Sequence, residues 1–207
     1  MLTPLLLLLL AYLFGSIPVS FLIARAAAGV DLRAVGSGNT GASNVYRVAG
    51  AGWAVLAFLG DALKGALPVW AALHLPSQSS TTDAWWVAGA GLLAVLGHLF
   101  PPWLKFRGGK GVATSFGVMV ILAPGPALLA LAVWAAVTLA SKRVSAGSLA
   151  AALALPVSVY VFKAGPAKIW LALALAGLIF VAHHENLGRL LRGEEPAIRR
   201  NPPQEKL

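Results

Sequence analysis

The chain alternates long apolar runs with short polar stretches, and this pattern predicts a helical membrane protein. An α-helix rises roughly 1.5 Å per residue, so about 20 apolar residues cross the hydrocarbon core of a bilayer. The apolar runs cover residues 2–24, 48–75, 84–100, 112–123, 126–140, 147–162 and 169–182. We therefore expect an all-α, polytopic integral membrane fold with about seven transmembrane or part-spanning helices.

The two shortest runs, 112–123 and 126–140, lie on either side of a Pro-Gly-Pro break. Neither spans a bilayer comfortably, so we expect a hairpin of short helices whose first arm is re-entrant. The first run of the chain has a rival interpretation as a signal peptide. No Lys or Arg precedes it, whereas Arg25 and Arg33 follow, which favours a membrane helix.

Composition agrees with the pattern, since 58% of the 207 residues are hydrophobic and only 11% are charged. Soluble domains are nearer a quarter charged. With so much of the chain in lipid, we expect one membrane-embedded domain covering residues 1–207. The sequence contains no Cys, which excludes disulfides and thiolate chemistry.

The distribution of positive charge predicts an orientation. Thirteen of the 16 Lys and Arg residues fall on one side of the expected helices: Arg25, Arg33, Arg47, Lys105, Arg107, Lys110, Lys142, Arg143, Arg189, Arg192, Arg199, Arg200 and Lys206. The positive-inside rule places that side in the cytoplasm, with the N-terminus outside and the C-terminus inside. The net charge of +9 lies in short loops between apolar runs, which favours anionic headgroups or substrates and argues against nucleic acid.

Two charges interrupt the second apolar run. Asp61 and Lys64 are three residues apart and share one helix face, so they can form an ion pair. Charges at membrane depth are costly and are usually functional. A structural ion pair is the favoured interpretation, and direct chemistry is the alternative.

Three polar stretches are expected on the cytoplasmic side, near residues 29–47, 97–114 and 183–195. The middle one reads GHLFPPWLKFRGGKGVAT from residue 97, and its cations alternate with Gly108, Gly109 and Gly111. Glycine lets backbone N–H groups turn toward a ligand, and Lys110 adds a point charge just before a helix start. The stretch is not a Walker A loop. It predicts either a phosphate-binding cradle or a basic turn between two membrane helices.

The other two stretches carry hydrogen-bonding groups beside cations. The first reads GSGNTGASNVYR at 36–47, where Arg47 can hold a phosphate bidentately. Its alternative is a polar turn with a helix N-cap. The third begins HHEN at 183, so His183 and Asn186 share a helix face. A lone histidine at a helix end is often only a cap or a filler, and this alternative also applies to His98.

Several enzyme classes are excluded by spacing. The HxxxxD acyltransferase signature, the HExxH zinc motif and the GxSxG nucleophile elbow are all missing from the sequence. Only seven Asp and Glu residues occur, which argues against a carboxylate metal site and against a two-carboxylate hydrolase. We expect no cofactor.

Together the patterns GSGNxGxxNxxR, GHxFPxxxxFxGGKGVAT and HxxNxxRLxxGxE resemble the PlsY-type acyl-phosphate:glycerol-3-phosphate acyltransferases of bacterial membranes. The resemblance covers nearly the whole chain, including DALKG at 61–65. Arg107 stands where the family pattern has Lys. The resemblance implies transfer of a fatty acyl group from acyl phosphate to the 1-hydroxyl of glycerol 3-phosphate, at the cytoplasmic side of the bacterial inner membrane. Membrane lipid and a peripheral enzyme that makes acyl phosphate are the further partners it implies.

The same resemblance implies the site residues. The catalytic candidates are Ser37, His183 and Asn186. The substrate-binding candidates are Asn39, Asn44, Arg47, His98, Arg107, Gly108, Gly109, Lys110 and Gly111. The rival functions are a carrier for a phosphorylated small solute and a non-catalytic lipid-binding protein. A carrier needs a pathway from both sides, whereas these polar groups gather on one.

The predicted orientation is testable because the chain has no native Cys. Single cysteines replace Ser79 and Arg107, and intact cells are treated with an impermeant thiol reagent. We expect labelling at position 79 and none at 107 until the cells are opened. The reverse pattern would refute the map.

Overall fold

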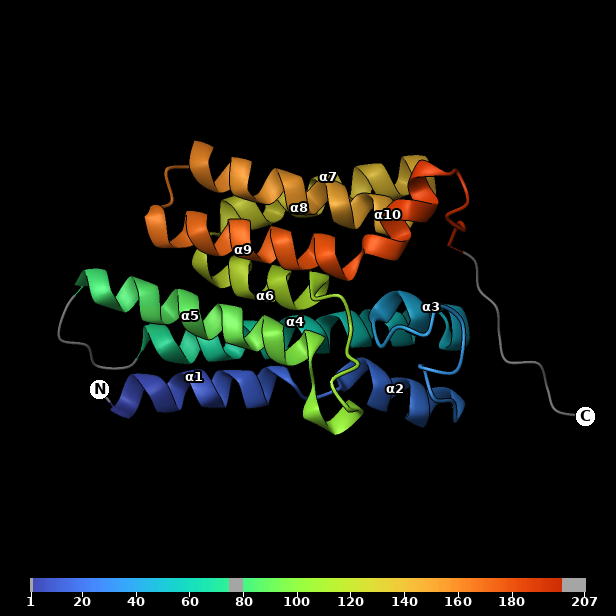
Figure 1. Cartoon of the computed structure of the whole chain (residues 1–207), viewed down its shortest axis with the longest axis horizontal. Coiled ribbons are helices and arrows are strands. Elements are labelled where there is room, and N and C mark those ends of the chain that lie inside the picture. The colour runs from blue at the N-terminus through green and yellow to red at the C-terminus, as the bar shows by residue number, and fades with distance from the viewer. Residues whose placement is uncertain (1, 75–79, 199–207) are drawn as a thin grey trace, which may run out of the picture.

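The protein is described from a computed structural model, which covers residues 2–74 and 80–198, and every regular element in those ranges is a helix (Figure 1). Ser79, Arg199, Arg200 and Lys206 lie outside the described residues. The helices are α1 (Leu2–Gly15), α2 (Val19–Ala28), α3 (Ala42–Ala49), α4 (Ala51–Leu73), α5 (Ser80–Leu99), η1 (Pro102–Leu104), α6 (Val112–Leu122), α7 (Pro124–Ser141), α8 (Val144–Val161), α9 (Pro166–Ala182) and α10 (His184–Leu191).

The predicted polytopic helical fold is confirmed. Within residues 2–74 and 80–198, five spans are long and apolar enough to cross a membrane: Leu5–Ala28, Ala51–Leu73, Asp83–Leu104, Pro124–Ser141 and Val144–Val161. Helices α9 and α10 make a sixth if they count as one span bent by 66°, and α6 is a shorter apolar helix. The expected hairpin forms from α6 and α7. The positions of the two termini relative to the membrane stay predictions.

Three local features were not resolved by the apolar pattern. The first run divides into α1 and α2 around Pro18, whose ring removes a backbone N–H donor. The second half of the first polar stretch is the short helix α3, and the third stretch is α10. Both short helices have one apolar face, so they pack on the bundle rather than crossing it.

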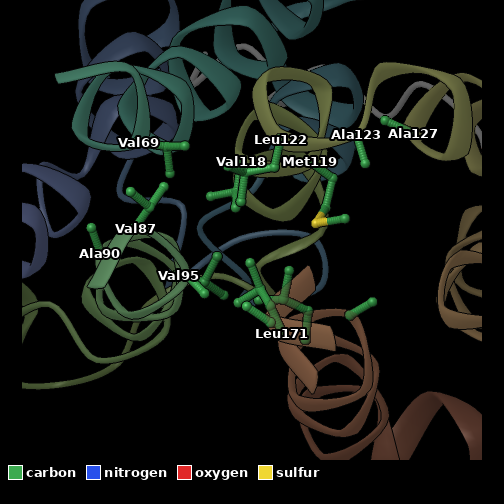
Figure 2. Close-up of a cluster of buried hydrophobic side chains, with 14 of the residues drawn as sticks. Val69, Val87, Ala90, Val95, Val118, Met119, Leu122, Ala123, Ala127 and Leu171 are labelled. Atoms are coloured by element: carbon green, nitrogen blue, oxygen red, sulfur yellow. The ribbon is translucent and has the colours of Figure 1, made fainter. Parts of the chain in front are cut away.

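Helix α6 occupies the middle of the bundle, in contact with α4, α5, α7 and α9 (Figure 1). Its side chains Val118 and Met119 are fully buried, and Figure 2 shows them facing side chains of α4, α5, α7 and α9. A second apolar cluster at the end of the bundle that carries α3 packs Leu32 and Val45 against Phe21 and Leu104. This cluster attaches the first polar stretch to α2 and to the loop after α5.

Helices α4 and α6 approach closely through small residues. A Cβ added to Gly117 would overlap the Ala62 carbonyl, and one added to Gly65 would overlap the Thr114 carbonyl. Small residues allow such backbone approach in membrane bundles, where packing replaces the hydrophobic driving force. The segment 61–65 of α4 is thereby held directly against the first half of α6.

This close packing predicts opposite effects for one substitution at two helical glycines. Alanine favours a helix by about 1 kcal/mol over glycine, but overpacking costs about 1–3 kcal/mol. We expect Gly117→Ala to lower the thermal unfolding temperature in detergent by several degrees. The matched control is Gly177→Ala in α9, where an added Cβ meets nothing within 4 Å, and it should be neutral or stabilising. A Gly117→Ala protein as stable as wild type would contradict the α4–α6 contact.

Candidate active site

The first polar stretch is shaped by Asn44, which lies on α3 and is 1% exposed. Its amide nitrogen donates at 3.0–3.1 Å to the backbone carbonyls of Leu32, Val35 and Asn39. Its amide oxygen accepts from the backbone N–H of Ser37 at 3.2 Å. Gly36, at φ +59°, leaves no room for a Cβ beside this amide oxygen. The Asn44 amide thus holds the shape of the loop, and the substrate contact expected of Asn44 stays a prediction.

The loop that Asn44 holds presents Ser37 to solvent and leaves Asn39 half-buried. Arg47 follows one turn after Asn44 on α3, and its side chain passes close to Gly36. The spacing of three residues puts both side chains on one face of the helix. Helix α3 therefore holds the loop through Asn44 and supplies a cation beside it, Arg47.

The glycines of the second stretch pack against the end of α5. The N–H of Gly108 donates to the Leu99 carbonyl at 3.0 Å, and that of Gly109 donates to the His98 carbonyl at 3.1 Å. These two donors are engaged within the protein, and the phosphate contacts expected of the two glycines stay predictions. A Cβ at Gly108 would overlap the His98 carbonyl, and one at Gly109 would overlap the His98 ring. The two glycines let the loop lie against the end of α5.

The start of α6, just after Gly111, remains available as an anion-binding element. Gly111 takes a left-handed conformation at φ +80° and begins α6, so the first N–H groups of that helix have no intrahelical acceptor. Lys110 directly precedes this start, and its ammonium group donates to the Asn186 amide oxygen on α10. The second and third stretches therefore meet at Lys110.

Asn186 is held from its other end by Glu195. The Asn186 amide nitrogen donates to Glu195 Oε1 at 2.6 Å, and the Ser145 hydroxyl donates to the same oxygen at 2.7 Å. Arg189 Nε donates to Glu195 Oε2 at 2.7 Å. Glu195 is 6% exposed and joins α8, α10 and the segment after α10. Both carboxylate oxygens of Glu195 thus accept hydrogen bonds.

Glu195 also sets the local electrostatics. Burial alone would raise the pKa of Glu195, but the hydrogen bonds from Ser145, Asn186 and Arg189 outweigh it and hold the pKa below its usual value. Burial lowers the pKa of Lys110 to about 8, although the charge of Glu195 opposes that shift. Burial also lowers the pKa of Arg47, again against Glu195. Arg47 and Lys110 act on one carboxylate and on each other, so the two cations share one electrostatic environment.

His183 caps α9 and is 3% exposed. Its Nδ1 lies 2.8 Å from the Ile179 carbonyl oxygen. Because a carbonyl can only accept, this contact assigns the proton to Nδ1 and leaves a lone pair on Nε2. His183 also lies within range of the Lys110 charge. The residue is thus a base candidate beside the Lys110–Asn186 contact.

Two predicted residues lie elsewhere. His98 is buried, with Nδ1 3.6 Å from Asp61 Oδ1 inside the bundle. Arg107 is exposed and lines an open hollow of about 620 Å³ with Arg33, Lys105 and backbone of the first stretch. Among the described residues, the lining of that hollow does not include Arg47, Lys110 or Asn186. Hydrogen bonding or electrostatic interaction with Lys110 therefore links Arg47, His183 and Asn186, whereas Arg107 lines an open hollow.

The comparisons with known proteins identify the family of the chain. Residues 5–193 match the family described as glycerol-3-phosphate acyltransferase. The chain belongs to the glycerol-3-phosphate acyltransferase family.

Relatives of similar length carry the same description. The glycerol-3-phosphate acyltransferase of Syntrophotalea carbinolica is 43% identical over 91% of this chain and 94% of its own. That of a Synechococcus strain, JA-2-3B'a(2-13), is 46% identical over 96% of both chains. The crystal structure of PlsY, an integral membrane glycerol 3-phosphate acyltransferase in its glycerol 3-phosphate form, superposes with a TM-score of 0.87 at 38% identity, covering 95% of this chain and 96% of that one.

Two residues that support the site, Glu195 and Ser145, were not named as candidate site residues from the sequence. Glu195 had a signal, since it is the last residue of the pattern HxxNxxRLxxGxE and one of only seven acidic residues. Ser145 had none, because a serine near the start of an apolar helix is ordinary. Tertiary contacts alone show that Glu195 holds Asn186 and that Ser145 holds Glu195.

Two neighbouring glutamates allow a matched test of this network. Replacing Glu195 by Ala leaves Arg189 and Asn186 without an acceptor, and hydrogen bonds to charged groups are worth about 1.5–3 kcal/mol. We expect Glu195→Ala to lower the thermal unfolding temperature by roughly 5–10 °C in detergent. Glu194→Ala removes only the solvent-exposed pair with Arg192 and should shift it by less than about 2 °C. Equal shifts for the two variants would show that Glu195 does not hold the third stretch.

Proposed function

We propose that this chain transfers a fatty acyl group from acyl phosphate to the 1-hydroxyl of glycerol 3-phosphate, releasing inorganic phosphate. As a family member it is a glycerol-3-phosphate acyltransferase, whose product is lysophosphatidic acid. The acyl donor and the roles of individual residues are the proposed part. The observation that carries the proposal is the meeting of Lys110 with Asn186 beside Arg47 and His183.

Two phosphate groups need cationic partners at such a site. Arg47 offers a planar guanidinium that can bind a phosphate bidentately, and Lys110 offers a point charge. The N-terminal N–H groups of α6, after Gly111, add donors on the same side of Lys110. These groups can also stabilise negative charge on the acyl carbonyl oxygen and on the departing phosphate.

The fatty chain needs an apolar site that reaches the same place. A cavity between α6, α7 and α8 is lined almost entirely by apolar side chains, including Val112, Phe116 and Trp134. Val112 follows Gly111 directly, so the cavity begins within one turn of Lys110. At about 60 Å³ the cavity admits only part of a fatty acyl chain, so the rest of the chain would lie along the lipid-facing surface of the helices, with the phosphate end beside the cations.

The chemistry proposed is direct transfer. The 1-hydroxyl oxygen bonds to the acyl carbon, the bond from that carbon to the phosphate oxygen breaks, and phosphate leaves with the electron pair. The hydroxyl proton goes to His183 Nε2 or to a substrate phosphate. Acyl phosphate is already activated, so orientation of two anions supplies much of the catalysis. Ser37 then serves as a hydrogen-bonding residue, and no acyl-enzyme forms.

The orientation of the site follows from the charge distribution. Multi-pass insertion in a membrane is established by the fold and the family. We place the site at the cytoplasmic side of the bacterial inner membrane, where glycerol 3-phosphate reaches it from water and acyl phosphate from the bilayer. A peripheral enzyme that makes acyl phosphate is the partner such a supply requires.

The function is tested with purified protein, acyl phosphate and glycerol 3-phosphate. We expect lysophosphatidic acid and phosphate in equal amounts. A reaction with radiolabelled acyl phosphate alone, quenched with acid, should leave the protein unlabelled. Label on Ser37 that glycerol 3-phosphate releases at the turnover rate would overturn direct transfer. Uptake of glycerol 3-phosphate into proteoliposomes without product would favour the carrier.

Arg47 and Lys110 should act mainly through phosphate binding. Loss of a charge-assisted hydrogen bond costs about 1.5–3 kcal/mol, so Arg47→Ala and Lys110→Ala should each lose at least about tenfold in kcat/KM. The pH profile gives Lys110 its own signature. In wild type, kcat/KM for glycerol 3-phosphate should fall as pH rises above about 8, because the free ammonium loses its proton there.

Lys110→Arg is the control for this profile, since arginine stays charged throughout. We expect a lower kcat/KM with no fall up to about pH 10. A fall near pH 8 retained in Lys110→Arg would assign that titration to another group.

A further inference from the structure

The Asp61–Lys64 pair lies in the interior of the bundle, one helical turn apart on α4. The two side chains are 1% and 4% exposed, and Lys64 Nζ lies 2.9 Å from Asp61 Oδ1. Charges at membrane depth are rare and usually mark function. The reaction proposed above uses neither group directly, so the pair needs its own explanation.

One side of the pair holds the break between α1 and α2. Lys64 Nζ donates to the Ile17 carbonyl at 2.8 Å, and the Ser20 hydroxyl donates to Asp61 Oδ2 at 2.5 Å. Pro18 interrupts the helix there, so the neighbouring backbone needs outside partners. The contacts at the α1–α2 break therefore supply a carbonyl acceptor for Lys64 and a hydroxyl donor for Asp61 Oδ2.

The other oxygen of Asp61 faces His98. His98 Nδ1 lies 3.6 Å from Asp61 Oδ1, and His98 is 5% exposed. Among the described residues, Asp61 Oδ1 is paired with Lys64 Nζ at 2.9 Å and accepts no further hydrogen bond, and His98 Nδ1 has no hydrogen-bond partner. Among the described residues, Asp61 is the acidic side chain that faces His98 Nδ1, and a small rotation of the ring would give Nδ1–H an acceptor. Asp61 is therefore placed to select which ring nitrogen carries the proton.

The far side of the His98 ring contacts the glycine loop. Gly109 lies against Nε2 so closely that a Cβ would overlap it, and the Gly109 N–H donates to the His98 carbonyl. Lys110 is the next residue. A contiguous series of contacts thus runs from Asp61 through the imidazole and Gly109 to Lys110.

The same segment of α4 also places the helix that follows Lys110. Ala62 lies against Gly117, and Gly65 lies against Thr114, all within 61–65 on α4 and the first half of α6. The segment 61–65 of α4 therefore supports the 109–111 segment at both ends, through His98 on one side and through α6 on the other. Rigid support of this kind decides how well a binding group is held in place.

We propose that Asp61, with its charge balanced by Lys64, is a positioning residue that orients His98 and thereby sets the location of Lys110 in the phosphate site. This inference rests on the proposed function of Lys110. It assigns His98 a role through Gly109 rather than a direct contact with substrate. Neither Asp61 nor His98 exchanges a proton with the substrate.

The experiment replaces the pair as a unit, because removing one partner leaves a buried charge that costs several kcal/mol. Asp61→Leu/Lys64→Met removes both charges and the acceptor facing His98. Asp61→Asn/Lys64→Met removes both charges but keeps an amide oxygen as acceptor. Ser20→Ala is the matched control, since it removes the hydrogen bond to the opposite oxygen of Asp61.

We expect KM for glycerol 3-phosphate to rise at least tenfold in Asp61→Leu/Lys64→Met, with kcat changed less than threefold. The Asn variant should recover most of that loss, and Ser20→Ala should stay within twofold of wild type. Both double variants should unfold at similar temperatures. Equal KM values for the two double variants, or a wild-type KM in the Leu variant, would overturn the positioning role.

A measurement on the wild-type protein keeps the inference testable if neither double variant folds. The chain has four histidines, so ¹⁵N-histidine NMR in detergent resolves each ring once His98→Gln identifies one signal set. We expect His98 to carry its proton on Nδ1, facing Asp61. A neutral ring with the proton on Nε2 would refute the contact. This readout needs no turnover, so it stands apart from failure of the proposed reaction, which wild type would reveal by making no lysophosphatidic acid.

Discussion

The ion pair between Asp61 and Lys64 lies where an isolated charge would cost several kcal/mol, so the surrounding helices have to supply partners for it. They do so from two directions: Ile17 and Ser20 at the α1–α2 break, and His98 at the end of α5. Such a pair contributes little net stability compared with apolar packing. Its effect is to restrict how α1, α2, α4 and α5 fit together beneath the glycine loop.

Lys110 lies between two buried polar networks. One reaches it from inside the bundle through His98 and Gly109. The other reaches it from α8 and α10, through Glu195 and Asn186. Each network anchors on a carboxylate, in a chain with only seven acidic residues. A lysine that is partly buried needs such support, because burial lowers its pKa and weakens its charged form. Two of the scarce carboxylates therefore serve the geometry and charge of one cation.

The glycine loop shows why a motif and its geometry are separate observations. Glycines beside a lysine predict backbone donors for a phosphate, and the start of α6 at Gly111 retains that capacity. Gly108 and Gly109 are needed for another reason, since the loop touches the carbonyl and ring of His98. The missing Cβ allows close packing in this case. The sequence pattern cannot separate these two uses, because both require glycine at the same positions.

The sequence by itself determined the helical membrane fold, because apolar runs long enough for a bilayer leave little choice of structure. It also located the three polar stretches and their cations, and the Asp61–Lys64 pair follows from helical spacing alone. Only the tertiary structure decided which of these groups meet. The partners of Lys110 are 76 and 85 residues away, at Asn186 and Glu195, and no local spacing encodes such contacts. The tertiary structure likewise buried Asn44 and His98 and left Arg107 in a separate hollow, because packing of α3 and of the end of α5 depends on helices distant in sequence.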